Sequence, residues 1–414
     1  MKSIYKILLI TDNHNPDGGG AEKYFFTLKS ALEKQANLEV YSLSFGPEDK
    51  IDNNSIILKE TAKPLLRYFW RLFFNPFKYQ QIRRAIKRIN PDVIHLHNVK
   101  KYTISLLKAV RPYPVVQTLH DYACICPTGW NLHQNLQPCA TGLHTDCVWQ
   151  HRRDLNGIVY LGRLYAFLRL KTLLKKIVKK FIAPSPQLTN YLEQNNFPAP
   201  YYLPMFRANS KPLALENAQL RHFLYVGQLS PHKGVVNLIN EFALACQSNP
   251  KLILKIAGKG NCEAQLQAKV HALKLQENIF FLGWCDPEPL YEEAMAVIFP
   301  SIGLEAFGLV ITEAMRHGRP VIGSDRGPTA WLVDNKKTGL LYDPLIPGNL
   351  AEKILLLAED KKLVAEYGQN AAEKFNNMMG NEEIIARQME IYQSVMPAHP
   401  PLVIPAHSPP VIPA

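Results

Sequence analysis

The sequence lacks any apolar run of about 18 residues, the length that a membrane-spanning helix requires. Its first ten residues, Met1–Ile10, are largely apolar but too short for a signal sequence, and they lead into a glycine-rich turn, so they predict a first strand. Cysteine is scarce as well, with 7 in 414 residues, which argues against a disulfide scaffold. These absences favour a cytoplasmic protein without a transmembrane anchor.

Acidic residues are missing from two stretches of the first half, between Glu60 and Asp92 and between Asp154 and Glu193. The first stretch holds eight basic residues: Lys63, Arg67, Arg71, Lys78, Arg83, Arg84, Lys87 and Arg88. The second holds seven: Arg163, Arg169, Lys171, Lys175, Lys176, Lys179 and Lys180. These residues are enough to account for the net charge of +12, so the positive charge is concentrated in the first half of the chain.

The sequence also has no Asp-x-Asp metal-binding motif in a suitable loop. Four of the seven cysteines do cluster, with histidines between them: Cys124, Cys126, Cys139 and Cys147, interleaved with His133, His144 and His151. Thiolates and imidazoles at this density can hold structural zinc, with Cys126, Cys139 and Cys147 as the candidate ligands. The tight Cys124-Ile125-Cys126 spacing favours buried thiols in a long loop instead, and the loop's tryptophans suit a lid over a ligand.

Short apolar runs of strand length alternate with helical segments along most of the chain. The predicted strands are Ile4–Thr11, Leu38–Ser44, Asp92–His97, Val115–Leu119, His222–Gly227, Leu252–Ala257, Ile279–Leu282, Val297–Pro300, Val321–Ser324 and Gly339–Tyr342. In the first half, helices are predicted near Ala21–Gln35, Leu65–Ile89 and Tyr102–Val110. This alternation predicts an α/β protein with two Rossmann-like domains, each with a parallel sheet covered by helices on both faces.

A proline-studded stretch without periodicity, Phe197–Pro212, predicts the linker between the two domains. The domains are therefore expected at 1–205 and 206–396. Beyond them, Pro397–Ile404 and Pro405–Ile412 form an eight-residue repeat that differs at two positions. Its proline density excludes a helix and a central strand, so residues 397–414 are expected to form an extended, disordered tail.

The most informative segment of the second half is Pro300–Asp325, in which a strand is followed by a loop and a helix. Glu305 lies in the loop, and Glu313 follows eight positions later on the helix, so both carboxylates can face a ligand at the carboxyl end of the sheet. Carboxylates accept hydrogen bonds from the vicinal hydroxyls of ribose and of sugars. The backbone amides at the helix start are free donors for anions or sugar oxygens: Phe307, Gly308 and Leu309.

This glutamate pair resembles the Glu-(seven residues)-Glu motif of family 4 glycosyltransferases, which adopt the GT-B fold with two Rossmann-like domains that face each other across a cleft. Further segments resemble the family's motifs in the family's order: GGGAEKY at 18–24, PDVIHLHN at 91–98, TLHDY at 118–122, VGQLSPHKG at 226–234, AGKG at 257–260 and TGLLYDP at 338–344. The resemblance covers nearly the whole chain except the tail.

The resemblance implies a role for each matching residue. Glu313 would bind the ribose of a nucleotide-sugar donor, Glu305 would bind hydroxyls of the transferred sugar, and Lys233 would bind the diphosphate. His120 would contact the donor sugar from the first domain, and a glycine loop would complete the donor site: Gly18, Gly19 and Gly20. The resemblance further implies retention of anomeric configuration by same-face attack, with no metal and no cofactor.

One position departs from the family pattern. The family usually has arginine in the phosphate loop where this chain has Gln228, and a neutral amide donates a hydrogen bond without contributing charge. Diphosphate binding is therefore expected to depend more heavily on Lys233, with Lys259 and Arg326 as candidates to compensate.

A second helical pattern, at Ala166–Phe181, separates apolar from basic residues. Spaced at about 100° per residue, one face carries Phe167, Leu170, Leu173, Leu174, Ile177, Val178 and Phe181. The other face carries Arg169, Lys171, Lys175, Lys176, Lys179 and Lys180. Such a helix can pack on its own sheet while its charges face anionic lipid, which would place the protein on the inner face of the cell membrane and favour a lipid-linked acceptor.

The sequence therefore predicts a glycosyltransferase that extends a lipid-linked glycan in cell-surface polysaccharide synthesis, such as lipopolysaccharide or capsule. Two alternatives remain open: a nucleotide-sugar epimerase on the same fold, and a nucleic-acid-binding protein that uses the basic stretches. His95 and His97 alternate along a predicted strand and are expected on opposite faces, one of them as a satisfied core histidine.

Overall fold

The computed structural model describes most of the chain: residues 4–15, 18–52, 54–60, 70, 73–126, 129, 139, 157–206 and 220–396, without the side chains of 157–163 and 166. The predicted tail, 397–414, and the candidate zinc ligand Cys147 lie outside the described residues. The chain divides into two compact units. The first comprises Met1–Gly129, Thr141–Phe206 and Met379–Ala414, and the second comprises Trp130–Ala140 and Arg207–Met378.

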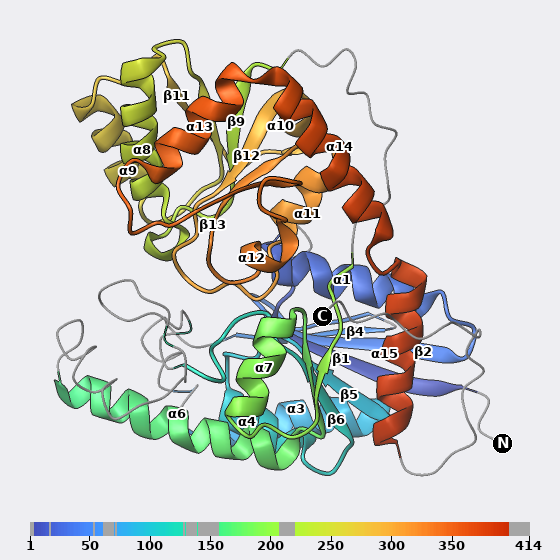
Figure 1. The fold of residues 1–414 in the computed structure, drawn as a ribbon. Coiled ribbons are helices and arrows are strands. Elements are labelled where there is room, and N and C mark those ends of the chain that lie inside the picture. The colour runs from blue at the N-terminus through green and yellow to red at the C-terminus, as the bar shows by residue number, and fades with distance from the viewer. Residues whose placement is uncertain are drawn as a thin grey trace. The chain divides into compact units, whose positions relative to one another are not determined.

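The first unit contains an eight-stranded sheet in the order β3-β4-β2-β1-β5-β6-β7-β8 (Figure 1). Its strands are β1 Tyr5–Asn13, β2 Leu38–Gly46, β3 Lys50–Asp52, β4 Ser55–Lys59, β5 Val93–Leu96, β6 Val115–Thr118, β7 Lys180–Ala183 and β8 Pro200–Tyr202. All neighbours pair in parallel except β3 and β4. The central strand β1 is almost wholly buried, as expected of a parallel strand covered on both faces.

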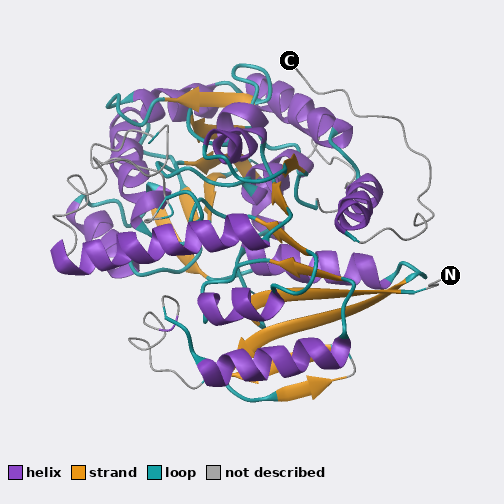
Figure 2. Cartoon of the chain, turned by 90° about the horizontal axis from the view of Figure 1, so that it is seen from below, coloured by secondary structure: helices purple, strands orange, loops and turns teal. Residues whose placement is uncertain are grey.

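Helices cover both faces of this sheet (Figures 1 and 2). They are α1 Gly20–Glu33, α3 Pro76–Ile89, α4 Thr103–Val110, α6 Gly157–Ile177, α7 Pro186–Gln194 and α15 Asn381–Val395. Helix α3 begins where the Asn75 side chain accepts a hydrogen bond from the Lys78 amide and Pro76 fills the first helical position. It ends at Asn90, which adopts the left-handed conformation. Helices α3, α4 and α6 lie side by side, whereas α1 and α15 contact the opposite face.

Two sequence-based expectations about this unit are corrected. The predicted helix Ala166–Phe181 ends at Ile177, and its last residues form strand β7, with Phe181 buried between β6 and β8. The helical spacing of Val178 and Phe181 was therefore coincidental. The last helix, α15, was expected in the second domain, but it packs on the first sheet beside β6.

The second unit contains a six-stranded, fully parallel sheet in the order β11-β10-β9-β12-β13-β14. Its strands are β9 His222–Val226, β10 Leu254–Ala257, β11 Ile279–Gly283, β12 Ala294–Phe299, β13 Val321–Ser324 and β14 Gly339–Tyr342. Its helical segments are η1 Pro231–Lys233, α8 Val235–Ser248, α9 Glu263–Ala272, α10 Glu288–Glu293, α11 Leu309–Arg316, α12 Thr329–Leu332, α13 Asn349–Glu359 and α14 Lys361–Asn377. Separate apolar cores form around Phe242 and Ile354 and around Ile311 and Phe375. Two α/β units with parallel sheets are thus confirmed.

Glycines hold the loops at the carboxyl edge of this sheet in close contact. A Cβ atom on Gly258, whose φ is +152°, would lie 1.9 Å from the Gly227 carbonyl oxygen. A Cβ on Gly234, with φ +70°, would lie 2.0 Å from the carbonyl oxygen of Pro300. Only glycine fits either position. The loops that follow β9, β10 and β12 therefore form one closely packed surface, on which the site residues lie.

Candidate functional site

The centre of the site in the second unit is a lysine–glutamate pair. Lys233 ends the short helix η1, and Glu305 lies in the loop between β12 and α11. The Lys233 Nζ donates a hydrogen bond to Glu305 Oε1 at 2.6 Å, and the Ser301 hydroxyl donates to the same oxygen. The side chains of Lys233 and Glu305 are 21% and 17% exposed, so the pair is largely shielded but still reachable from solvent. The structure thus brings together two residues that are 72 positions apart.

The surroundings of Glu305 favour its ionised form. Burial alone would raise the pKa of this carboxyl group. The positive charge of Lys233, its hydrogen bond and that of Ser301 outweigh burial and hold the pKa below its usual value. A negative carboxylate and a positive ammonium are therefore present side by side at neutral pH. Such a pair can offer an acceptor to sugar hydroxyls and a cation to a phosphate.

Glu313 lies on α11, half-buried, and is held by a tyrosine from another element. Tyr291, fully buried on α10, donates its hydroxyl to Glu313 Oε2 at 2.7 Å. Burial and the nearby Glu313 charge raise the pKa of Tyr291 well above its usual value, so it remains a donor. The Tyr291 ring stacks on His317 with centroids 5.1 Å apart. These contacts fix the orientation of the Glu313 carboxylate.

The start of α11 offers backbone donors beside these carboxylates. Gly308 precedes the helix with φ 94°, and the Ile311 amide already donates to its carbonyl oxygen at 2.9 Å, so the donors offered to a ligand are the amides before Ile311. The Phe307 side chain is buried against Trp331, with ring centroids 6.1 Å apart, so Phe307 can face a ligand only through its backbone. Leu309, half-buried, is the first residue of the helix. This geometry is compatible with the predicted role of the three amides.

The residues in and near the predicted phosphate loop differ in their exposure and in their partners. Gln228 is exposed, and its carbonyl oxygen accepts a hydrogen bond from the Tyr225 hydroxyl at 2.9 Å. Lys259 is exposed beside it in the loop after β10. Arg326 is buried, with its guanidinium 3.7 Å from the Asp343 carboxylate. Lys259 is therefore better placed than Arg326 to supply a second positive charge to a ligand.

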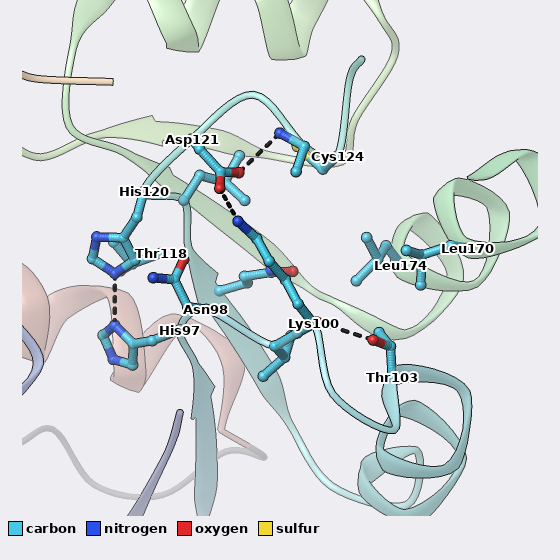
Figure 3. A pocket seen from close by; sticks show the side chains of 14 residues that line it. His97, Asn98, Lys100, Thr103, Thr118, His120, Asp121, Cys124, Leu170 and Leu174 are labelled. Atoms are coloured by element: carbon cyan, nitrogen blue, oxygen red, sulfur yellow. Dashed lines mark hydrogen bonds and ion pairs between the residues drawn. The ribbon is translucent and has the colours of Figure 1, made fainter. Parts of the chain in front are cut away.

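In the first unit, three histidines form one buried cluster. His95 and His97 lie on the same face of the sheet, with ring centroids 4.2 Å apart, so the expectation of opposite faces was wrong, because residues two apart on a strand share a face. His95 is the satisfied core histidine: its Nδ1 lies 2.7 Å from the Tyr392 hydroxyl and its Nε2 lies 2.8 Å from Thr118 Oγ1. His97 Nδ1 lies 3.2 Å from His120 Nε2 (Figure 3).

The cluster is neutral at physiological pH. Burial lowers the pKa of His95 to about 3 and that of His120 to about 4, and it holds the pKa of His97 well below its usual value. The His97–His120 contact therefore joins a donor on one neutral ring to an acceptor on the other. A cavity of about 40 Å³ adjoins both rings, which is room for water but not for a sugar.

These lowered pKa values predict a loss of stability in acid. In the unfolded chain each histidine takes up a proton near pH 6.5, whereas the folded unit resists protonation until about pH 4. Stability is thus full above pH 6.5 and falls as the pH drops, by about 2 kcal/mol per histidine at pH 5. We expect His97→Asn to lose less stability than the wild type between pH 7 and pH 5 in urea unfolding experiments. Equal losses in the two proteins would contradict this assignment.

The glycine loop also lies in the first unit. Gly19 precedes α1, and its carbonyl accepts the Lys23 amide at 3.0 Å, while Gly20 is the first residue of the helix. Gly18 and Gly19 line a cleft of about 510 Å³ at the carboxyl edge of the first sheet. The structure therefore brings Lys233 and Glu305 together in the second unit and places His120 and the glycine loop in the first.

The cysteine cluster gives no metal site within the described residues. Cys124, Cys126 and Cys139 are buried, and no three His, Cys, Asp or Glu side chains of the described chain come together as a metal-binding group. Burial raises the pKa of the Cys124 thiol far above its usual value, which disfavours the thiolate that zinc requires. The third candidate ligand, Cys147, lies outside the described residues.

Sequence reasoning missed three residues that orient the site: Ser301, Tyr291 and Tyr392. Ser301 lies within the segment Pro300–Asp325, and its hydroxyl four positions before Glu305 is a signal that the sequence offers. Tyr291 reaches Glu313 from 22 positions away, and Tyr392 reaches His95 from 297 positions away. No local pattern marks such partners, because they are brought into contact only by the packing of separate elements.

Comparisons with known proteins agree with this architecture. A family model described as Glycosyltransferase Family 4 matches residues 18–202, and one described as Glycosyl transferases group 1 matches residues 207–374. The two matches meet at the boundary between the two units. Fold and matches together define a glycosyltransferase of the GT-B class. The chain belongs to glycosyltransferase family 4.

Individual relatives match over shorter lengths. D-rhamnosyltransferase WbpZ of Pseudomonas aeruginosa is 32% identical over 163 residues, which are 38% of this chain and 41% of that protein. O-antigen chain mannosyltransferase C of Escherichia coli is 26% identical over 179 residues, 42% of this chain and 47% of that protein. The alignments thus span less than half the length of these curated relatives. The crystal structure of Anabaena HepE in complex with UDP and glucose covers 94% of this chain and 100% of that one, with a TM-score of 0.67 and 20% identity, which shows a shared fold.

Proposed function

We propose that this protein is a retaining glycosyltransferase that transfers a hexose from a nucleotide-diphosphate sugar to a glycan acceptor. The observation that carries the proposal is the Lys233–Glu305 pair at the carboxyl edge of the second sheet, with Ser301 holding the carboxylate. One member of the pair suits phosphate, and the other suits sugar hydroxyls. The complex of the Anabaena neighbour with UDP and glucose supports a ligand of this class.

In this proposal the donor extends along the loops of the second unit. Its ribose hydroxyls bind the Glu313 carboxylate that Tyr291 orients. Its diphosphate binds Lys233 and the exposed loop at Gln228 and Lys259. Its sugar hydroxyls bind Glu305 and the amides at the start of α11, whose partial positive charge also favours the diphosphate. His120 contributes from the first unit, through an imidazole that is neutral at pH 7.

The proposed reaction retains the configuration of the anomeric carbon. The acceptor hydroxyl attacks from the face that the diphosphate leaves, and a departing phosphate oxygen takes the acceptor's proton. Negative charge builds on that oxygen as the glycosidic bond breaks, so Lys233 and the amides of α11 stabilise the transition state more than the ground state. No metal ion enters the proposed reaction, because fixed positive groups carry out the neutralisation.

The acceptor is proposed to be a lipid-linked glycan at the inner face of the cell membrane, within cell-surface polysaccharide synthesis. The names of the rhamnosyltransferase and the O-antigen mannosyltransferase support this class of product. Exposed basic residues on the two helices that contact α4 support an anionic surface as the partner: Arg83, Arg84, Lys87 and Arg88 on α3, and Arg169 and Lys176 on α6. No helix in the described part of the chain is long and apolar enough to cross a bilayer.

The test is to incubate the purified protein with a panel of nucleotide-sugars and to measure slow donor hydrolysis without acceptor. We expect hydrolysis of at least one donor, with release of a sugar of the original anomeric configuration. Conversion of the donor into an isomeric nucleotide-sugar would instead identify an epimerase. Binding to RNA rather than to anionic vesicles at the same salt concentration would favour the nucleic-acid alternative.

Glu313→Ala should weaken binding of the free nucleoside diphosphate by about tenfold or more, since hydrogen bonds to a charged acceptor contribute about 1.5–3 kcal/mol. Tyr291→Phe should cause a smaller loss in the same direction, because it removes only the donor that orients Glu313. Calorimetric titration of both variants measures the two losses. Unchanged affinity in Glu313→Ala would exclude the ribose role.

A further inference from the structure

The imidazoles of His97 and His120 meet at the carboxyl ends of two neighbouring strands, β5 and β6. His97 directly follows β5, and its amide donates a hydrogen bond to the Ile10 carbonyl oxygen on β1 at 2.9 Å. His120 lies just beyond β6, and the amide of the residue before it, Leu119, donates to the Ile182 carbonyl oxygen on β7 at 2.9 Å. The sheet thus fixes the backbone that carries both rings, and it brings His97 Nδ1 to 3.2 Å from His120 Nε2 (Figure 3).

Aromatic rings pack against this histidine pair. The His97 ring meets Phe25 edge to face, with centroids 5.2 Å apart, and the His120 ring meets Tyr24 in the same way at 5.3 Å. Phe25 and Tyr24 are both buried residues of α1. His95 stacks on His97, but both of its ring nitrogens already have hydrogen-bond partners. Among the side chains that the structure describes, only His120 therefore forms a hydrogen bond with His97.

The direction of this hydrogen bond follows from the burial of the two remaining ring nitrogens. His97 Nε2 and His120 Nδ1 are buried, and neither has a hydrogen-bond partner in the part of the chain that the structure describes. Both rings are neutral, so each carries one N–H, and only one of the two N–H groups can lie in the contact. The other N–H is left unpaired, which costs least on the less buried ring. His97 is 1% exposed whereas His120 is half-buried, so the unpaired N–H belongs on His120.

We infer that His97 is a positioning residue for His120: it donates its Nδ1–H to His120 Nε2, places the His120 proton on Nδ1 and fixes the plane of that ring. The Nδ1–H of His120 is then the group that this ring offers to a hydroxyl of the donor sugar. The inference deepens the proposed function and rests on it for the contact between His120 and the sugar. The hydrogen bond between the two rings does not depend on that function, so it can be tested separately.

The first experiment locates the proton on His120 without any substrate. Proton–nitrogen correlation spectra of the histidine rings are recorded at neutral pH on protein made with isotope-labelled histidine, and the His120 signals are those that His120→Ala lacks. We expect His120 to be protonated on Nδ1 in the wild type and in His97→Asn, because the asparagine amide can still donate to Nε2. His97→Leu, which has no donor, should lose this preference.

Two results of these spectra would overturn the inference. One is protonation of His120 on Nε2 in the wild type, and the other is unchanged Nδ1 protonation in His97→Leu. The wild-type spectrum decides the direction of the hydrogen bond even if His97→Leu is too unstable to purify. Urea unfolding of each variant shows whether it is folded under the conditions of the measurement.

The second experiment asks whether His97 acts through His120. Donor hydrolysis without acceptor is measured for His97→Leu, His97→Asn, His120→Ala and the double variant with His97→Leu and His120→Ala. We expect His97→Leu to lower kcat about fivefold or more, as the loss of one neutral hydrogen bond would, and His97→Asn to recover most of that loss. In the His120→Ala background, His97→Leu should change kcat by less than about twofold, because its partner is already absent. Binding of free nucleoside diphosphate should stay within about twofold of the wild type in every variant, since His120 is assigned to the sugar.

The outcomes distinguish failure of this inference from failure of the proposed function. No hydrolysis by the wild type, or a wild-type rate in His120→Ala, would contradict the proposed function, and the ring spectra would still test the hydrogen bond. A large loss in His120→Ala with an unchanged rate in His97→Leu would overturn the inference. An equal fall of kcat on His97→Leu with and without the His120 imidazole would also overturn it, because His97 would then have a structural role only.

Discussion

Lys233→Ala should weaken the binding of a nucleoside diphosphate by about 10- to 100-fold and reduce turnover by more than that. A hydrogen bond from a charged group contributes about 1.5–3 kcal/mol, and its effect grows as negative charge builds on the leaving oxygen. The substitution also removes the cation that holds the pKa of Glu305 below its usual value, so burial would then raise the pKa of this carboxyl group. Calorimetric titration of the nucleoside diphosphate and steady-state kinetics measure the two effects.

Gln228 provides the matched control for Lys233. Gln228→Ala should cost less in both binding and rate, because its exposed neutral amide contributes at most an uncharged hydrogen bond. Gln228→Arg should preserve or tighten nucleoside diphosphate binding, and turnover could fall if product release then limits the reaction. If Lys233→Ala binds like the wild type, the phosphate site lies elsewhere and the proposed mechanism loses its main electrostatic element.

Glu305→Ala should lower turnover without weakening the binding of nucleoside diphosphate. It removes the carboxylate proposed to hold the transferred sugar, so turnover should fall by about 100-fold or more. It also releases Lys233 from its hydrogen bond at 2.6 Å, so free nucleoside diphosphate should bind as well as it binds the wild type, or more tightly. The same titrations and kinetics on this variant test both expectations.

Ser301→Ala is a milder change at the same site as Glu305→Ala. It removes one hydrogen bond to Glu305 Oε1 but keeps the carboxylate and Lys233, so only a partial loss of turnover is expected. If Glu305→Ala and Glu313→Ala lose nucleoside diphosphate affinity equally, the division of roles between the two glutamates is incorrect.

Much of the fold could be predicted because the buried strands are short apolar runs between polar loops. The strands Val321–Ser324 and Gly339–Tyr342 lie where the sequence predicts them. Strand β7 was missed because Val178 and Phe181 fit a helical spacing as well as a buried strand, and only pairing with β6 and β8 decides between them. The order of the strands follows from such pairing and has no local signature.

The site was predicted in part. The spacing of Glu305 and Glu313 placed both at one edge of the sheet, but the Lys233–Glu305 contact depends on how the loop after β9 packs against the loop after β12. That packing is controlled by backbone contacts, in which the amides of Ile302 and Gly303 both donate to the His232 carbonyl oxygen at 3.0 Å. Backbone hydrogen bonds of this kind are formed irrespective of side-chain type, so the sequence carries little trace of them.

The place of α15 has a consequence for how the protein forms during synthesis. In the described chain the second unit consists of residue 139 and the continuous segment 220–378, whereas the first sheet receives its covering helix α15 only from residues 381–395. Until that segment has left the ribosome, His95 has no Tyr392 hydroxyl beside it and one face of the first sheet stays partly open to water. Units of a chain usually complete their folding in the order of synthesis. Here the unit that begins first is completed only after the second unit, so its open face stays exposed to chaperones while the second unit is being made.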